Sequence, residues 1–455
     1  MLLATLFLFQ QTPTQPVSKL SDELRRLAQP LIAAEIVPGL VVGWISSTGD
    51  SESFGLGRYS NKDERVPDGR TIFEIGSITK TFTALAFAAE VERSSITLET
   101  TLNELVPSHC QLPRSEKPVR LIDLATHTAG FPSIPSNLAR DATRFLIDYS
   151  DFGEAQLHSF MRSFSSLSDP GERYLYSNAG YGILGWALAH HSNQSVEQML
   201  IKSVCHPLQM LNTRFRIPTA GQIHAAPGHD SNGDVVPRTE YGSLDACGEL
   251  TSTADDLARY LAVLLAPSRT QNEPLRRALT NATRVHFKSN AKYDLGLAWH
   301  FPVAGSAFFH DGRTDGHSAF IFVDREHQTA GIVLANGSTE RIGEFGVLFQ
   351  QLLNGEQIDP PKLRVPLQLS SAQLSILTGH YRSPLGFELS VTLENGRLYT
   401  EQIRQPAVRL LAAAPNRFYA IDQLTEFSFE LGEQDQSPSS LTVRKNGRQT
   451  RYSRR

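Results

Sequence analysis

Strand patterns at both ends of the first 350 residues, separated by a long helical stretch, constrain the fold of this chain most strongly. Apolar, β-rich runs occur over 40–46 and 51–57, and again over 297–301, 306–310, 318–323 and 329–334. Strands need partners for their backbone groups, and strands at both ends of a helical stretch suggest one sheet that both ends build together. The sequence predicts a mixed α/β (α+β) fold: an antiparallel sheet built from both termini and flanked by helices, with a helical subdomain inserted.

Helical periodicity marks the elements around this sheet. Ser21 is a candidate N-cap for a helix that carries leucines at helical spacing and stops before Pro38-Gly39. Residues 79–91 form a nearly all-apolar helical run, which must be buried on most sides. A last amphipathic helix ends at Asn354-Gly355.

The character of the sequence changes after Asp359-Pro360-Pro361. Short alternating runs follow, with Asn395-Gly396 and Asn446-Gly447 as strong hairpin signals. We therefore predict a large domain over 19–356, a linker over 357–367 and a small antiparallel β-barrel-like domain over 368–455.

The first residues indicate export. The apolar run Leu2–Phe9 is too short to span a bilayer, and a polar segment containing prolines follows it. Residues 1–18 resemble an export signal, although they lack a basic n-region and an A-x-A cleavage site; a frayed terminus or a wrongly chosen start codon is the alternative. The prediction is a periplasmic or secreted protein with no transmembrane span in the mature chain.

Charge and cysteine content exclude several classes of function. The chain has 43 basic and 47 acidic residues without blocks of like charge, which gives no electrostatic footprint for nucleic acid. Its cysteines, Cys110, Cys205 and Cys247, are far apart, so a zinc cluster or a disulfide scaffold is not expected. Asp230-x-Asn232-x-Asp234 begins like a calcium loop but lacks the required Gly and Glu. We assign no metal and no cofactor.

The first candidate for chemistry is the pair Ser77 and Lys80, which opens the apolar helix. Residues three apart share one helix face, and a desolvated lysine can take the proton of a serine. The helix N-terminus would also offer N–H groups to a developing oxyanion. The spacing alone is weak, because Ser289 and Lys292 repeat it in a polar stretch.

Tyr176-Ser177-Asn178 forms the second candidate. A phenol near a lysine can carry protons, and an asparagine amide can hold a substrate carbonyl. The same three residue types recur at 59–61, and an ordinary turn with a packed tyrosine is the alternative interpretation of either copy.

The third candidate is His310-Asp311-Gly312-Arg313, at the end of a predicted strand. Gly312 would let a substrate backbone approach closely, and the next N–H could complete an oxyanion hole. A lone histidine at a strand end is more often structural.

Together, these segments resemble the serine β-lactamase and penicillin-binding-protein superfamily, in the branch that holds class C β-lactamases, low-molecular-mass DD-peptidases and related esterases. The resemblance covers roughly 35–354, and five segments carry it in the right order: 73–83, 124–132, 170–181, 248–257 and 310–316. The C-terminal strands resemble, more loosely, a lipocalin-like domain appended to some members.

The resemblance implies that Ser77 attacks an amide or ester carbonyl while Lys80 and Tyr176 share the proton transfers. It implies that Asn178 positions the substrate, and that the N–H groups of Ser77 and Arg313 hold the oxyanion. His310 would lie beside the acyl group or its carboxylate, and Tyr176 would activate the deacylating water.

Two positions depart from the family pattern. His310 stands where class C β-lactamases carry a lysine, and Arg313 fills a position that is usually small. A neutral imidazole grips a β-lactam carboxylate less strongly than an ammonium group. Both departures count against efficient β-lactamase activity.

The expected function is that of a serine hydrolase working through an acyl-enzyme. Its substrate would be a small molecule or peptide: a cell-wall peptide, a β-lactam or an acyl ester. The alternatives are a penicillin-binding sensor that acylates without turnover and a short-chain acyl esterase.

Overall fold

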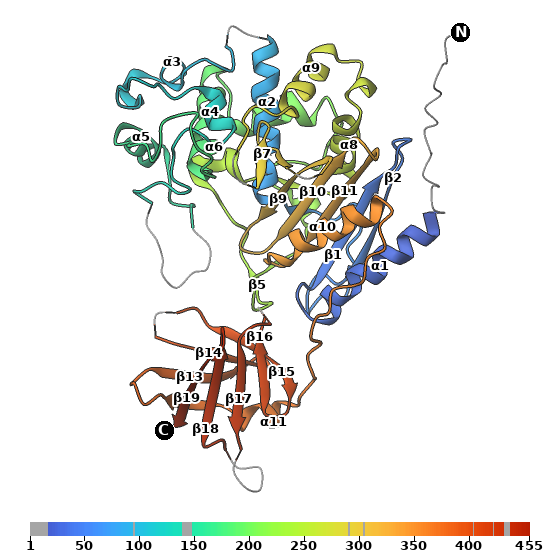
Figure 1. Cartoon of the computed structure of the whole chain (residues 1–455), viewed down its shortest axis with the longest axis vertical. Helices are drawn as coiled ribbons and strands as arrows, with labels where there is room; N and C mark the ends of the chain where they lie inside the picture. The colour runs from blue at the N-terminus through green and yellow to red at the C-terminus, as the bar shows by residue number, and fades with distance from the viewer. Residues whose placement is uncertain are drawn as a thin grey trace, which may run out of the picture.

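The computed structural model describes residues 17–93, 96–138, 148–289, 292–303, 305–403, 405–421, 423–431 and 437–455. All but the last two residues of the predicted export signal over 1–18 lie outside these ranges. The structure combines helices with an antiparallel sheet, and ends in a closed eight-stranded barrel (Figure 1).

The large sheet joins the two ends of the first 350 residues, as predicted. Its strand order is β2-β1-β11-β10-β9-β8-β7. Strand β1 (Gly39–Ile45) pairs antiparallel with β2 (Ser51–Gly57) on one side and with β11 (Thr329–Ala335) on the other. Leu40 thereby lies opposite Ala335, almost 300 positions later in the chain.

The other half of the sheet runs from β10 (Ser318–Asp324) through β9 (Ala307–Arg313) to β8 (His300–Pro302) and β7 (Tyr293–Leu295). The predicted strand over 297–301 is wrong in its placement. Leu297 and Ala298 lie in the turn between β7 and β8, where Ala298 adopts a φ of 69°. Its backbone N–H donates to the Ala125 carbonyl at 3.0 Å, outside the ladder of the sheet.

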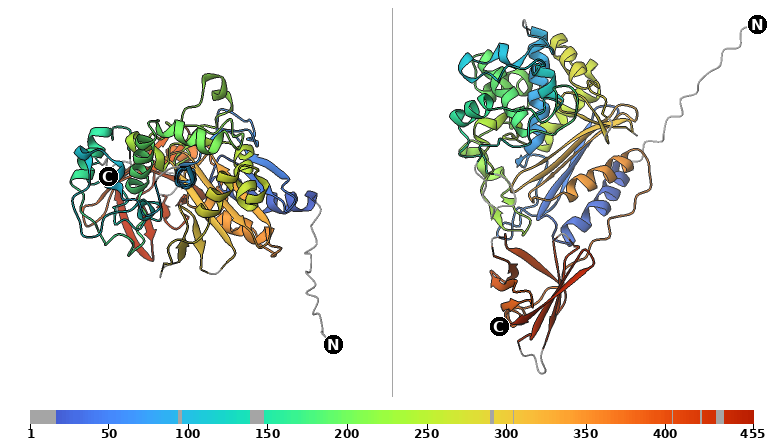
Figure 2. Two further views of the ribbon diagram at one scale, coloured as in Figure 1. Left: turned by 90° about the horizontal axis from the view of Figure 1, so that it is seen from above. Right: turned by 60° about the vertical axis from the view of Figure 1, so that its left-hand side comes forward.

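Both faces of the central strands are covered. Along β1, Leu40, Val42 and Trp44 point into one apolar core, while Val41 and Ile45 point into the other. Helices α1 (Val17–Ala33) and α10 (Arg341–Leu353) cover the first face (Figure 2). Ser21 lies inside α1, so its prediction as an N-cap is wrong.

Helix α2 (Thr79–Arg93) runs through the helical layer on the second face and is buried on all sides from Thr79 to Ala89, as its composition predicted. The other helices on this side lie between residues 102 and 282, in the stretch between the first and the last strands of the large sheet. They are α3 (Leu102–Leu105), α4 (Leu121–Ala125), α5 (Glu154–Arg162), α6 (Asn178–His191), α7 (Val196–Leu200), α8 (Ala254–Leu265) and α9 (Glu273–Ala282).

The C-terminal barrel follows the short helix α11 (Ser371–Ser375) and encloses its own apolar core. Its strands are β12 (Gly379–Arg382), β13 (Glu388–Glu394), β14 (Arg397–Glu401), β15 (Val408–Ala414), β16 (Arg417–Ala420), β17 (Glu426–Glu430), β18 (Ser440–Lys445) and β19 (Arg448–Arg454). Both predicted hairpins form. Asn395 and Gly396 have φ values of 50° and 75°, as a type I′ turn requires.

A small hairpin of β4 (Gly228–His229) and β5 (Val235–Val236) connects the large domain to the barrel. The Asp234 carboxylate accepts hydrogen bonds from Arg397 and from the Tyr399 hydroxyl, each at 2.8 Å. Asn232 accepts from the Arg409 backbone N–H at 2.9 Å. The segment that began like a calcium loop therefore forms a turn that binds the barrel.

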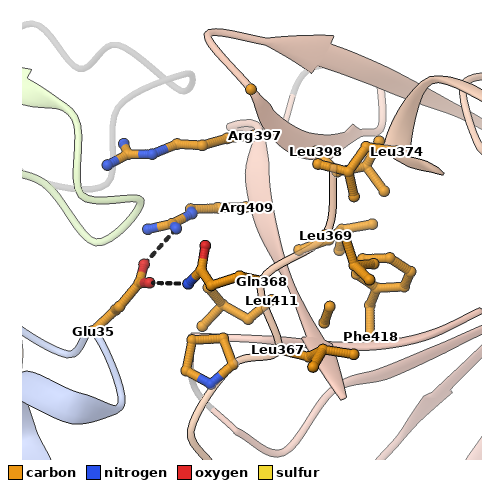
Figure 3. A pocket seen from close by; sticks show the side chains of 14 residues that line it. Glu35, Leu367, Gln368, Leu369, Leu374, Arg397, Leu398, Arg409, Leu411 and Phe418 are labelled. Atoms are coloured by element: carbon orange, nitrogen blue, oxygen red, sulfur yellow. Dashed lines mark hydrogen bonds and ion pairs between the residues drawn. The ribbon is translucent and has the colours of Figure 1, made fainter. Parts of the chain in front are cut away.

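A second group of contacts lies beside this hairpin. Glu35 accepts hydrogen bonds from Arg409 at 2.5 Å and from Gln368 at 3.2 Å, at the edge of a cavity of about 60 Å³ (Figure 3). Within the described ranges, no helix is both long and apolar enough to cross a membrane.

Candidate active site

Ser77 and Lys80 meet where the chain enters α2. Ser77 is the middle residue of a single 3-10 turn, η1 (Gly76–Ile78), and Lys80 is the second residue of the helix. The Lys80 Nζ lies 2.8 Å from the Ser77 Oγ. Ser77 itself is half-buried, which leaves its hydroxyl within reach of a ligand.

The Lys80 ammonium is fully buried. Its second hydrogen bond goes to the Cys247 carbonyl at 2.7 Å, and the ring of Tyr176 lies 5.0 Å away. Burial lowers the pKa of Lys80 to about 8, against a smaller opposing effect from Cys247 and the Asp311 carboxylate. About one molecule in ten therefore carries a neutral Lys80 amine at pH 7, one pH unit below this pKa, and that amine can accept the Ser77 proton.

Tyr176, which lies just before α6 in the chain, contacts the same Ser77 oxygen. Its hydroxyl donates to the Ser77 Oγ at 2.7 Å. Burial raises the pKa of Tyr176 well above its usual value, an effect that the Ser77 hydrogen bond only partly offsets. Tyr176 is therefore protonated at neutral pH. It can pass a proton on, but it is not a tyrosinate that could act as a base.

Two glycines bring β9 directly against the turn that carries Ser77. A Cβ on Gly312 would lie 2.0 Å from the Ile75 carbonyl oxygen and 3.2 Å from the Ser77 nitrogen. A Cβ on Gly76, where φ is 48°, would lie 2.7 Å from the Arg313 nitrogen. Only glycine fits at either place, and the close approach brings the end of β9 into contact with the turn that carries Ser77.

His310 lies fully buried on β9, not at its end, since the strand continues to Arg313. Its Nδ1 donates to the Asp311 carbonyl at 2.6 Å, because a carbonyl can only accept. The Nε2 therefore bears a lone pair, and this buried atom has no hydrogen-bond partner. Burial, with His300 and Lys80 nearby, holds the pKa of His310 well below its usual value, so the imidazole is neutral.

Asn178 and the Arg313 side chain are held by residues outside this group. The Asn178 Nδ2 donates to the Tyr149 hydroxyl at 3.0 Å, while its Oδ1 is buried without a hydrogen-bond partner. The Arg313 guanidinium forms an exposed ion pair with Glu340 at 3.1 Å. Of the predicted site residues, Ser77, Lys80 and Tyr176 are in direct contact, and Asn178 is joined to Tyr149 instead.

The aromatic side chains of His127, Tyr174 and His300 lie near Tyr176, and the sequence did not predict a role for any of them. His127 stacks on the Tyr176 ring at 4.5 Å, and its Nδ1 accepts from the Ser177 backbone N–H at 3.0 Å. The Tyr174 hydroxyl and the His300 Nε2 are hydrogen-bonded at 3.1 Å. The centroid of the His300 ring lies 5.2 Å from that of His310. Burial lowers the pKa values of both histidines, that of His300 to about 4. His127 lay within a segment that carried the family resemblance, whereas no spacing pointed to His300.

Asp311 adds a negative charge near this site, although its side chain alternates with that of His310 and so lies on the other face of β9. This residue is exposed on β9 between His310 and Gly312, and its carboxylate acts on Lys80, Tyr176 and His300. Because both nearby histidines are neutral and Arg313 is paired with Glu340, a partly charged Lys80 is the main source of positive charge at the site.

The duplicate motifs of the sequence lie elsewhere in the structure. The Ser289 backbone N–H donates to Asp294 at 3.0 Å, and the Lys292 Nζ lies over the Tyr293 ring. The Tyr59 hydroxyl bonds the Thr71 hydroxyl at 3.0 Å. One candidate metal-ligand group, His109, Cys110 and His158, occurs among the described residues, and it shares no member with the Ser77 site.

Comparisons with known proteins find similarity over most of this chain. A family model described as Beta-lactamase matches residues 24–348. A beta-lactamase of Pseudomonas fluorescens is 28% identical over 60% of this chain and 71% of its own length. Penicillin-binding protein 4* of Bacillus subtilis is 25% identical over 84% of this chain and 87% of its own length, so its similarity extends into the barrel region.

Proposed function

This chain belongs to the beta-lactamase family, and on that premise we propose that it is a serine hydrolase that forms an acyl-enzyme on Ser77. The observation that supports this most directly is the convergence of Lys80 and Tyr176 on one oxygen, at 2.8 and 2.7 Å. Ser289 has the same spacing to a lysine, but its backbone N–H is bonded to Asp294 and the Lys292 Nζ lies over the Tyr293 ring.

In the acylation step, the Ser77 hydroxyl donates its proton to the neutral amine of Lys80 as its oxygen attacks the substrate carbonyl. The N–H groups of Ser77 and Arg313 stabilise the oxyanion that forms. The bond to the leaving group then breaks, and the proton passes from Lys80 through the Tyr176 phenol to that group.

Deacylation runs the same proton path in reverse. A water molecule attacks the acyl carbonyl and gives its proton through Tyr176 to Lys80, and Ser77 regains its proton as it leaves. The family resemblance implied that Tyr176 activates this water. Since its pKa is raised well above its usual value, we propose that Lys80 is the base and Tyr176 the relay.

The charge at the site favours neutral substrates. A carboxylate on the substrate would meet a neutral His310, and the Arg313 guanidinium is already paired with Glu340. We therefore propose a peptide-like amide or an acyl ester as the preferred substrate, with β-lactams as slower ones. Export to the periplasm or the medium remains a prediction from residues 1–18.

A second candidate function is a penicillin-binding sensor that acylates without turnover. The relative named penicillin-binding protein 4* favours it, because that match covers both the large domain and part of the barrel region. The two functions share the acylation step and differ only in the lifetime of the acyl-enzyme.

An intact-mass time course separates these functions. The full-length protein is mixed with a penicillin or with a chromogenic short-chain acyl ester, and mass and substrate loss are followed together. We expect steady ester hydrolysis and a slow, transient penicillin adduct, both lost in Ser77→Ala and retained in Ser289→Ala. A lasting adduct without turnover of either compound would support the sensor, and turnover that survives in Ser77→Ala would contradict both functions.

A further inference from the structure

Three metal-ligating side chains meet at the surface of the helical layer, and a fourth, that of Glu154, lies beside one of them; none of their elements contributes to the Ser77 site. His109 and Cys110 belong to the 3-10 turn η2 (Ser108–Cys110), and Glu154 and His158 lie one turn apart on α5. One ligand atom each from His109, Cys110 and His158 lie within 4.8 Å of one another. The Glu154 Oε1 is 3.5 Å from the His158 Nε2.

We propose that these four residues form a binding site for a borderline-soft divalent cation, with zinc as the best match. Two imidazoles, a thiolate and a carboxylate are the donors that zinc prefers, and four of them complete a tetrahedral shell. Bond lengths of about 2.0–2.3 Å place neighbouring ligand atoms roughly 3.3–3.8 Å apart in such a shell. The ligand atoms of His109, Cys110 and His158 therefore need only small movements to close around an ion, while the exposed Glu154 side chain must turn from His158 toward the other two ligands.

The hydrogen bonds around the cluster leave its ligand atoms available. The His158 Nε2 is buried and has no hydrogen-bond partner. The Cys110 thiol donates only to the Pro107 carbonyl, at 3.2 Å.

The framework of the site is held independently of any ion. The Arg162 guanidinium on α5 donates to the His109 carbonyl at 3.2 Å, which ties η2 to the helix. The Trp186 indole N–H on α6 contacts the Glu154 carboxylate at 3.4 Å, and its ring lies 5.1 Å from His158. These outer contacts orient the ligands, as the surroundings of metal sites commonly do.

Charge balance also fits a divalent cation. On binding, the Cys110 thiol releases one proton to solvent and its thiolate forms the metal–sulfur bond, while both imidazoles bind through neutral nitrogens. A dication with one thiolate and one carboxylate leaves no net charge in this half-buried place. The site would fasten η2 to α5 and stabilise the helical layer, because a ligand that binds only the folded chain shifts unfolding.

The test is a titration of the full-length, metal-free protein with Co²⁺, followed by competition with Zn²⁺. We expect one Co²⁺ per chain, a near-ultraviolet thiolate-to-cobalt band and loss of that band when Zn²⁺ is added. Cys110→Ser should abolish the band, and the exposed His109→Gln should weaken Co²⁺ binding at least tenfold without affecting folding. Zn²⁺ should also raise the melting temperature of the wild type but not that of Cys110→Ser.

Two variants serve as matched controls. Cys205→Ser removes an equally buried thiol, and His191→Gln removes another exposed histidine of the helical layer. Both should bind Co²⁺ like the wild type. The absence of a thiolate band in the wild type, or a band that survives in Cys110→Ser, would overturn the proposal.

Discussion

At the scale of single residues, burial sets the protonation state of every group around Ser77. It brings the pKa of Lys80 to about 8 while it keeps Tyr176 protonated and His310 neutral. Lys80 is therefore the one group in direct contact with Ser77 whose charge changes within the working pH range of most enzymes. The exposed Asp311 carboxylate opposes the effect of burial on Lys80, because its negative charge favours the ammonium form of that side chain.

The pH dependence of acylation follows from these shifts. The neutral amine of Lys80 is the reactive form, so we expect the rate to rise with pH and to level off above about 8. Asp311→Asn removes a charge that raises the pKa of Lys80, so the inflection should move to lower pH. The rate at pH 7 should then rise by about two- to threefold, since an exposed, screened charge has a small effect.

Stopped-flow acylation by an uncharged ester between pH 6 and 10 measures this. Glu344→Gln, which removes an exposed carboxylate paired with Arg341, is the control and should leave the profile unchanged. An inflection that stays in place or moves upward in Asp311→Asn would refute the electrostatic argument.

At the scale of elements, the close packing of β9 on η1 creates the site. Strand β9 continues to Arg313 because Arg313 still pairs with Ser318 on β10. Gly312 lets this last stretch touch the turn that holds Ser77. A side chain at this position would separate β9 from η1, and with it the Ser77 and Arg313 N–H groups that we propose as the oxyanion donors.

Gly312→Ala tests this packing. The added methyl group would lie 2.0 Å from the Ile75 carbonyl oxygen, so β9 must move away from η1. We expect kcat to fall by about 10²–10³, the effect of losing one oxyanion donor. Gly343→Ala is the matched control, because nothing lies within 4 Å of its added Cβ in α10.

Circular dichroism and steady-state ester hydrolysis compare the two variants. The Gly343→Ala protein should keep full activity and gain about 0.5–1 kcal/mol of stability. Full activity in Gly312→Ala would show that the close approach of β9 is not needed.

The sequence predicted the elements of the site better than their ends and contacts. The Ser77 helix and the strand of His310 were correct because apolar periodicity reflects burial. The strand was ended too early because Asp311-Gly312 is typical of a turn, whereas the structure uses Gly312 for close packing. His300 was missed because it reaches Tyr174 through tertiary contacts that no local pattern records.

At the scale of the whole molecule, the hairpin of β4 and β5 links the barrel to the site. One end bonds the barrel through Asp234 and Asn232. Its other end packs on the turn after β9, where a Cβ on Gly228 would lie 2.7 Å from the Gly316 Cα. The separate barrel domain could be predicted from hairpin signals. The junction could not, because its acidic turn resembles an incomplete calcium loop and nothing in it indicates a contact with the barrel.

Arg397→Ala tests the junction. It removes two hydrogen bonds to the hairpin, from the Arg397 Nη1 to Asp234 and to the Gly233 carbonyl. We expect a loss of about 1.5–3 kcal/mol in the stability of the docked barrel, typical of hydrogen bonds to charged groups. Calorimetry should then resolve the barrel as a separate, earlier transition.

Arg382→Ala, which removes a more exposed arginine on the barrel, is the comparison and should unfold like the wild type. Identical thermograms for both variants would mean that these contacts do not hold the barrel in place.

The most direct test of the proposed chemistry is covalent labelling by a serine-directed phosphonate, mapped by peptide mass spectrometry. We expect a single labelled residue, Ser77, with labelling abolished in Ser77→Ala and reduced at least a hundredfold in Lys80→Ala. Ser289→Ala and Lys292→Ala should label at the wild-type rate. Labelling at another residue, or undiminished labelling of Lys80→Ala, would contradict the proposal that Lys80 activates Ser77.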